Sequence, residues 1–183
     1  ALRSTFDVQT YGELAYGDLH YPLLAIRSRA WRDDRPSLLV TGGVHGYETS
    51  GVMGALQFVE RHGQDAAERV NWLVVPCVSP WAYERFQRWN FDAIDPNRAF
   101  KDGSPAQESL ALMRLVAQHQ AQYGPFAAHI DLHETTDTDE SEYRPALAAR
   151  DGKAFMELVD AGRWTKQVVK PRSKRGQRGR RWP

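Results

Sequence analysis

The stretch Leu38-Leu-Val-Thr-Gly-Gly-Val-His-Gly-Tyr-Glu48 joins a short apolar run to two glycines and then to a histidine and a glutamate. A short apolar run that ends in a glycine turn is typical of a buried strand rather than a helix. Residues 49–62 follow with aliphatic side chains at helical spacing, and we expect this helix to stop at Gly63. The stretch therefore predicts a strand, a turn and a helix in succession.

The rest of the chain continues this alternation of strands and helices. The patterns predict a second buried strand at residues 70–75, a helix at 106–122, a strand at 129–133, and an antiparallel edge pair formed by residues 5–10 and 21–27. We therefore expect an α/β fold, a three-layer α/β/α domain with a central mixed, mainly parallel sheet. In such sheets ligands bind at the carboxyl ends of the strands.

Two of these strand ends carry residues that bind metals. His45 and Glu48 follow the first strand three positions apart, and His133 ends a strand whose polar face also carries His129 and Asp131. Two histidines and one carboxylate form a ligand set that zinc uses in hydrolytic sites, where one position stays open for water. Each element alone occurs by chance, but together they predict a Zn²⁺ site with one ion per chain. We interpret His20, His62, His119 and His129 as ordinary surface or packing residues.

Three ordered motifs resemble those of the zinc metallocarboxypeptidase superfamily, which includes carboxypeptidase A type enzymes and the succinylglutamate desuccinylase and aspartoacylase group. Gly43-Val-His-Gly-Tyr-Glu48 resembles its first metal motif, Asp131-Leu-His-Glu-Thr-Thr136 its third-ligand strand, and Asp95-Pro-Asn-Arg-Ala-Phe100 its substrate-binding motif. The resemblance covers roughly residues 36–145. It implies a zinc-dependent hydrolase in which Asn97, Arg98 and a further Arg88 bind the carboxylate of the substrate.

The residue chemistry agrees with that role but leaves an alternative open. The planar fork of Arg98 can bind a carboxylate in bidentate fashion, and the amide of Asn97 can donate another hydrogen bond. The alternative is that residues 95–97 form a simple turn and that Arg98 pairs with Asp92 or Asp95 at the surface. Arg88 could likewise lie on an ordinary surface segment.

The general base is harder to find in this sequence. The resemblance implies a catalytic glutamate some sixty or more positions after His133, beyond Pro183, and we expect the chain to be truncated before it. Glu134, beside a zinc ligand, is the best candidate for a catalytic base within the chain, although adjacent strand residues point to opposite faces. Asp131 and Glu134 are also candidates to hydrogen-bond the metal-binding imidazoles.

Charge divides the chain into two parts. All 23 acidic residues lie at or before Asp160, whereas 9 of the 24 Lys and Arg lie from Arg163 onward. We therefore predict a carboxypeptidase-like domain at 1–162, ending in an amphipathic helix at 153–162, and a basic, poorly ordered tail at 163–183. An inactive zinc-binding protein, or one whose tail binds nucleic acid, is the alternative of another class. Nucleic acid is the less favoured partner, because the tail has few aromatic residues and no recognised nucleic-acid fold.

The favoured function is removal of a carboxy-terminal residue from a peptide. The alternative is release of an acyl group from an N-acyl amino acid, and both substrates carry a free carboxylate. The 84 residues between Glu48 and His133 favour the deacylase-like branch, whereas the residues that follow His133 favour the peptidase. A single cysteine, Cys77, fits a reducing compartment, so we expect a cytoplasmic protein with no membrane span and no secretory signal.

Overall fold

The computed structural model of the 183-residue chain describes residues 2–29 and 31–134. The predicted helix at 153–162 and the basic tail at 163–183 lie outside the described residues. The described part contains every strand and both long helices that the sequence predicts, together with the candidate metal ligands.

A five-stranded mixed sheet organises the described residues, with the strands in the order β1-β2-β4-β3-β5. The strands are β1 (Asp7–Tyr16), β2 (Leu19–Arg27), β3 (Ser37–Gly42), β4 (Asn71–Val75) and β5 (Ala128–Leu132). β3 pairs in parallel with both β4 and β5, whereas β2 pairs antiparallel with β1 and β4. The predicted edge pair is confirmed, and its two strands form a longer hairpin than expected.

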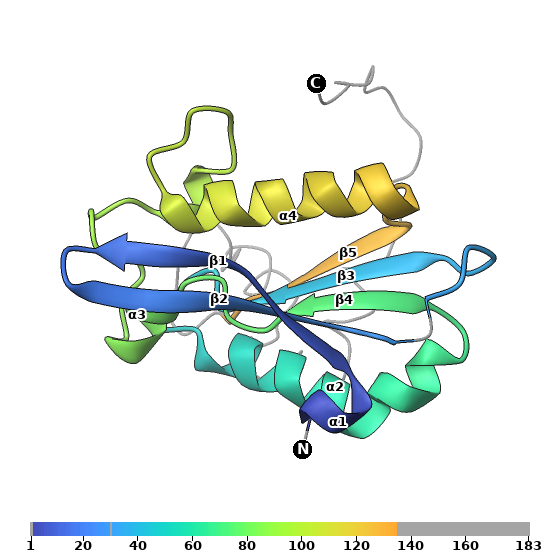
Figure 1. Cartoon of the computed structure of the whole chain (residues 1–183). Coiled ribbons are helices and arrows are strands. Elements are labelled where there is room, and N and C mark those ends of the chain that lie inside the picture. The colour runs from blue at the N-terminus through green and yellow to red at the C-terminus, as the bar shows by residue number, and fades with distance from the viewer. Residues whose placement is uncertain (1, 30, 135–183) are drawn as a thin grey trace, which may run out of the picture. The chain divides into compact units, whose positions relative to one another are not determined.

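Helices cover both faces of this sheet, as Figure 1 shows. They are α1 (Leu2–Thr5), α2 (Thr49–Ala67), α3 (Pro80–Glu84), a 3₁₀ turn η1 (Pro96–Arg98) and α4 (Gln107–Tyr123). α4 lies over one face, and α1 and α2 lie over the other (Figure 1). The predicted three-layer α/β/α architecture is therefore confirmed. Within residues 2–29 and 31–134, no helix is both long and apolar enough to cross a membrane.

Successive residues of the central strands pack alternately into two separate apolar clusters, one on each face of the sheet. Leu39 and Leu73 pack in the cluster that includes Leu112 of α4, whereas their neighbours Val40 and Val74 pack in the cluster that includes α2. This is the period-2 alternation of a sheet that is covered on both faces. The two clusters fix the sheet between its helices and so fix the positions of the strand ends.

Gly63 does not end the helix, and that prediction was wrong. α2 continues to Ala67, and a Cβ at Gly63 would lie 2.9 Å from the Phe6 ring and 3.1 Å from the Trp72 ring. The indole nitrogen of Trp72 donates a hydrogen bond to the carbonyl of Gly63 at 2.9 Å. Glycine is needed here because two aromatic rings pack directly against the helix backbone, and burial of those rings outweighs its low helix propensity.

Candidate metal centre and the adjoining loop

The sheet brings the two histidine-bearing segments together. β3 and β5 are adjacent parallel strands, and the last residue of β3, Gly42, lies opposite Leu132 at the end of β5. His45 follows β3 by three residues, and His133 follows β5 directly. Segments almost ninety residues apart in sequence therefore meet at the carboxyl ends of neighbouring strands.

The turn after β3 is held tightly in place. Gly43 has a φ of +61°, in the left-handed region that favours glycine. A Cβ at Gly46 would lie 2.0 Å from a backbone atom of Ala82, so the turn packs directly on α3. The Ser79 hydroxyl donates to the carbonyl of Val44 at 2.7 Å. These contacts fix the direction of the His45 side chain that follows.

The three predicted ligands form one cluster. Glu48 is the N-cap residue of α2, and its carboxylate lies between the two imidazoles. Its Oε1 is 2.8 Å from Nδ1 of His45, and its Oε2 is 2.6 Å from Nδ1 of His133. The candidate ligand atoms all lie within 4.8 Å of one another. His45 and Glu48 are buried, whereas the His133 side chain is 28% exposed, so His133 is the most solvent-accessible of the three.

A second carboxylate contacts the far nitrogen of each imidazole. Nε2 of His45 is 2.9 Å from Asp95, and Nε2 of His133 is 2.6 Å from Asp131. Asp131 was a sequence candidate for this role. The contact between Asp95 and His45 was not predicted, because nothing in the local sequence links residues fifty positions apart.

This donor set fits a divalent cation. A carboxylate at Nε2 favours the tautomer with its proton there, which leaves the Nδ1 lone pair of each imidazole directed at the Glu48 carboxylate. Two lone pairs and an anion around one point repel one another unless a cation or extra protons lie among them. Two histidine nitrogens and one carboxylate are ligands that Zn²⁺ accepts at about 2.0–2.2 Å.

The electrostatics of the cluster show the same need for positive charge. Burial acts to raise the pKa of Glu48, but hydrogen bonds with His133 and His45 outweigh it and lower the pKa to about 2. Hydrogen bonds with Asp131 and then with Glu48 raise the pKa of His133 to about 10. In both cases the charged form is favoured, so the site stabilises a cation next to the Glu48 carboxylate.

The loop before η1 and η1 itself carry the predicted substrate-binding residues, and Asp95 at their junction contacts the candidate ligand His45. Asp95 caps η1 by accepting the N–H of Asn97 at 2.9 Å, and its other oxygen is 3.2 Å from the Arg88 guanidinium. Arg88 also donates to the hydroxyl of Tyr47 at 3.1 Å, a contact that the sequence analysis missed. Arg98, at the exposed end of η1, donates to the carbonyl of Asn97 at 3.4 Å. Arg88 thus lies in the loop before η1 and Asn97 and Arg98 lie in η1 itself, and Asp95, between them in sequence, contacts His45.

Glu134 and His129 have contacts of their own. The Glu134 carboxylate accepts the backbone N–H of Ser50 at 3.1 Å, in the first turn of α2. His129, which we interpreted as an ordinary residue, lies 2.8 Å from the Thr41 hydroxyl, and that hydroxyl donates to Asp131 at 2.6 Å. His129 therefore supports the Asp131 side chain indirectly.

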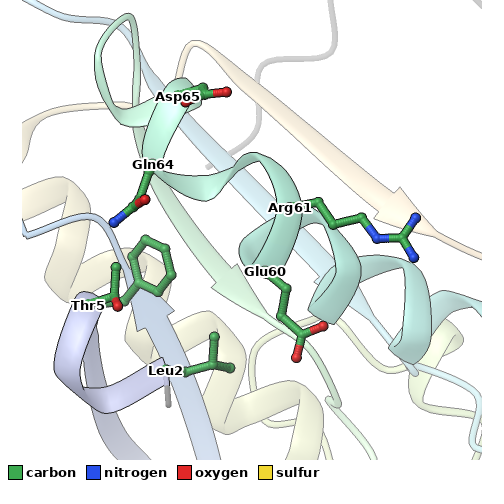
Figure 2. Close-up of a pocket in the computed structure, with 7 residues that line it drawn as sticks. Leu2, Thr5, Glu60, Arg61, Gln64 and Asp65 are labelled. Atoms are coloured by element: carbon green, nitrogen blue, oxygen red, sulfur yellow. The ribbon is translucent and has the colours of Figure 1, made fainter.

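A surface hollow of about 350 Å³ lies elsewhere, between α1 and the C-terminal half of α2. Figure 2 shows Leu2 and Thr5 from α1 on one side of it and Glu60 and Gln64 from α2 on the other. None of the predicted site residues lines this hollow. Because α2 begins at the metal cluster and the hollow lies toward its other end, the two features are distinct.

Most of the chain matches one protein-family model. Residues 34–169 match the model of the succinylglutamate desuccinylase/aspartoacylase catalytic domain. This match includes the metal cluster and the loop with Arg88 and Asp95. No curated protein sequence gives a match.

Solved structures share this fold over somewhat more than two thirds of the chain. A putative metallopeptidase from Shewanella amazonensis is 25% identical with a TM-score of 0.60, and the match covers 72% of this chain and 50% of that one. An aspartoacylase family protein from Mesorhizobium loti is 28% identical with a TM-score of 0.51, over 69% and 40% of the two chains. Carboxypeptidase A from Helicoverpa armigera, 16% identical with a TM-score of 0.60 over 73% and 42%, shares the fold. The match thus spans 40–50% of the length of these proteins.

Proposed function

Because the chain belongs to the succinylglutamate desuccinylase/aspartoacylase catalytic domain family, we propose that it is part of a zinc-dependent hydrolase that cleaves an amide bond near a free carboxylate. The observation that carries this proposal is the pair of Nδ1 atoms, from His45 and His133, that face the Glu48 carboxylate. Each far nitrogen meets an aspartate, which is the arrangement that orients histidines toward a metal.

The proposed metal ligands are His45, Glu48 and His133. Zinc at this site would supply a Lewis acid that polarises the scissile carbonyl and activates a water molecule. Asp95 and Asp131 hold the imidazole rings in the required tautomer. Because His45 and Glu48 are almost fully buried, the charge of the Glu48 carboxylate acts in a region of low dielectric where electrostatic interactions are strong.

The proposed binding site for the substrate carboxylate consists of Arg88, Asn97 and Arg98. An arginine fork binds a carboxylate with good directionality, and an amide beside it adds a hydrogen bond. Asp95 contacts both His45 and Arg88, and it also caps the turn that carries Asn97. Through this one side chain the carboxylate site is held at a fixed position relative to the metal cluster, and such positioning is a large part of catalysis.

Glu134 is the proposed general base among the described residues. Its carboxylate follows a metal ligand directly, but it accepts a hydrogen bond from the Ser50 backbone N–H. To accept a proton from water it would have to rotate away from this helix terminus. A Glu134→Gln variant keeps most of the capping geometry and removes the basic oxygen, so loss of hydrolysis with zinc retained would support this role.

Two substrate classes follow from different comparisons. The 25% identical putative metallopeptidase from Shewanella amazonensis supports hydrolysis of a peptide. The family model and the 28% identical aspartoacylase family protein support hydrolysis of an N-acyl amino acid. We favour the peptidase, as in the sequence analysis. Parallel assays with an N-blocked dipeptide and with N-acetyl amino acids separate the two, because only one class of substrate should be hydrolysed at an appreciable rate.

The first experiment measures zinc per chain by elemental analysis. We expect about one zinc in the wild-type chain and a loss of stoichiometric zinc in His45→Ala and in His133→Ala. His62→Ala, at an exposed position on α2, is the matched control and should keep its zinc. Zinc retained in His133→Ala would contradict the ligand set. Zinc binding without hydrolysis of either substrate would favour an inactive zinc-binding protein.

A further inference from the structure

A second buried carboxylate lies outside the metal cluster. Glu108, in the first turn of α4, is 0% exposed. Its Oε1 accepts the hydroxyl of Tyr16 at 2.5 Å, and its Oε2 accepts the side-chain amide of Asn90 at 3.1 Å. Tyr16 and Asn90 are themselves only 4% and 3% exposed. A carboxylate buried this deeply is costly unless its hydrogen bonds are specific, so this network calls for an explanation.

Asn90 organises the loop in which it lies. Its side-chain oxygen accepts hydrogen bonds from the backbone N–H groups of Asp92 and Ile94, both at 3.0 Å. Its backbone N–H donates to the carbonyl of Ile94. Ala93, inside this loop, has a φ of +57°, which is strained for a residue with a Cβ. The hydrogen bonds of Asn90 therefore hold the loop in a conformation that it would not adopt alone.

The orientation of the Asn90 amide requires an acceptor at residue 108. Because two backbone N–H groups occupy its oxygen, only the NH₂ group of Asn90 faces Glu108. The carboxylate offers one oxygen to this amide and the other to the Tyr16 hydroxyl. Its position in the first turn of α4 adds favourable interaction with the helix dipole.

The loop that Asn90 organises carries Arg88 at one end and Asp95 at the other. The next residue of α4, Ser109, donates its hydroxyl to the carbonyl of Pro96 at 2.9 Å, which fixes the start of η1. From these contacts we infer that Glu108 and Asn90 are positioning residues: they hold the loop with Arg88 and Asp95 so that it binds the substrate carboxylate beside the metal ligand His45. This inference rests on the proposed function of that loop.

A reciprocal exchange of amide and carboxylate tests the inference. Asn90→Asp keeps the oxygen that accepts the two loop N–H groups but directs a second oxygen at Glu108, so that two carboxylates face each other. Adding Glu108→Gln restores the pair, because the glutamine amide can donate to the new aspartate while its oxygen still accepts from Tyr16. The double variant therefore restores both the hydrogen-bond donor and the net charge of the pair.

Asn71→Asp provides the matched control. Asn71 is also a buried asparagine, 1% exposed, whose side chain hydrogen-bonds backbone groups of Arg32 and Arg35. It begins β4, at the end of the sheet opposite the metal cluster, because β3 and β4 are parallel. The substitution should lower the melting temperature as Asn90→Asp does, without any effect at the candidate site.

Three measurements on zinc-loaded protein decide the outcome. They are zinc stoichiometry, affinity for N-acetylglycine by calorimetry, and hydrogen exchange of peptides that cover residues 86–98. We expect Asn90→Asp to keep its zinc, to bind N-acetylglycine about tenfold more weakly or worse, and to exchange faster in that loop. The double variant should recover both properties, and Asn71→Asp should change neither.

The outcomes separate this inference from the proposed function. If the wild-type chain binds N-acetylglycine and Asn90→Asp binds it equally well, the positioning role is overturned and the proposed function stands. If the wild-type chain binds no carboxylate, the proposed binding site fails, and with it the role in substrate binding. In that case, faster hydrogen exchange of the loop in Asn90→Asp, with normal exchange in the double variant, would still support a role of Glu108 and Asn90 in ordering the loop. Unchanged exchange in Asn90→Asp would overturn the ordering role as well.

Discussion

Glu48 and Glu108 are both buried glutamates at the start of a helix, but their surroundings differ. Glu48 is the N-cap residue of α2, without a side-chain capping hydrogen bond, and is 3% exposed, whereas Glu108 lies in the first turn of α4 and is 0% exposed. Neutral donors, Tyr16 and Asn90, satisfy the oxygens of Glu108. Glu48 faces two imidazole nitrogens instead, and each imidazole is backed by another carboxylate.

The difference lies in the hydrogen-bond donors that surround each carboxylate. Neutral donors of the protein satisfy Glu108, whereas the surroundings of Glu48 favour an additional cation. Around Glu108 each acceptor oxygen has one donor, so the network is complete within the protein. Around Glu48 there are three carboxylates and two imidazoles. Arg88 pairs with one of these carboxylates, Asp95, and the remaining positive charge must come from added protons or from a metal ion. Burial of a carboxylate alone is therefore not evidence for a metal site, and the chemistry of its partners has to be considered as well.

The largest expected effect comes from removing the charge of each glutamate in turn. Glu48→Gln should weaken zinc binding by more than about 100-fold, because it removes a ligand rather than an outer partner. Glu108→Gln should weaken zinc binding far less, because its contacts are with Tyr16 and Asn90 and it acts on the candidate ligands only through the loop that carries Asp95. Competition with a chromophoric chelator measures both affinities. Equal losses in the two variants would mean that the two carboxylates do not differ in the way described.

A smaller effect on zinc is expected from the carboxylates behind the histidines. Asp131→Asn keeps the shape of the side chain but removes the negative charge 2.6 Å from Nε2 of His133, so zinc affinity should fall by about 10–100-fold. Asp34→Asn, an exposed aspartate that pairs with Arg32, is the control and should have no effect on zinc. The same chelator competition applies, and an unchanged affinity in Asp131→Asn would remove Asp131 from the site.

Local sequence patterns predicted that the candidate ligands His45, Glu48 and His133 lie together, because each of them follows a strand end. The local pattern of an apolar run, a glycine turn and a helix start predicted where His45 and Glu48 lie relative to β3 and α2. Parallel pairing of β3 with β5 then places His133 beside them. The Glu108 network could not be predicted in this way. It joins positions 92 and 18 residues apart through side chains that look like ordinary helix and loop residues in sequence.

The error at Gly63 has a related cause. Helix propensity and capping rules concern the helix alone. Here two aromatic rings from outside the helix, those of Phe6 and of Trp72 in β4, pack against Gly63. The contact between Asp95 and His45 was missed for the same reason, since it depends on how the loop before η1 folds back on the turn after β3. Tertiary packing decided each of these features.

The closed network at Glu108 predicts a cost in stability rather than in metal binding. Tyr16→Phe leaves one oxygen of a fully buried carboxylate without its donor, so the free energy of unfolding should fall by about 2–3 kcal/mol. Tyr21→Phe removes a similar bond to Glu84 at an exposed position and should cost less than about 0.5 kcal/mol. Urea denaturation of both variants measures the difference, and equal costs would show that burial of Glu108 has no energetic weight.

The smallest expected effect concerns His119, a buried histidine that lies away from both carboxylates. It is 7% exposed, its ring stacks on Phe126 at 4.4 Å, and its Nε2 has no hydrogen-bond partner within the described residues. Burial, followed by the charge of Arg27, lowers the pKa of His119 below its ordinary value of 6.5. The folded protein therefore resists the proton that the unfolded chain accepts as the pH falls.

The sign of the resulting pH dependence follows directly. The contribution of His119 to stability is complete above about pH 6.5 and is lost as the pH falls from there through the lower pKa of the folded state. His119→Phe should therefore lose less stability than the wild type between pH 7 and pH 5, as measured by urea denaturation at both values. His62→Phe, at an exposed site on α2, should retain the wild-type slope. An unchanged slope in His119→Phe would mean that His119 accepts a proton in the folded state as readily as it does in the unfolded chain.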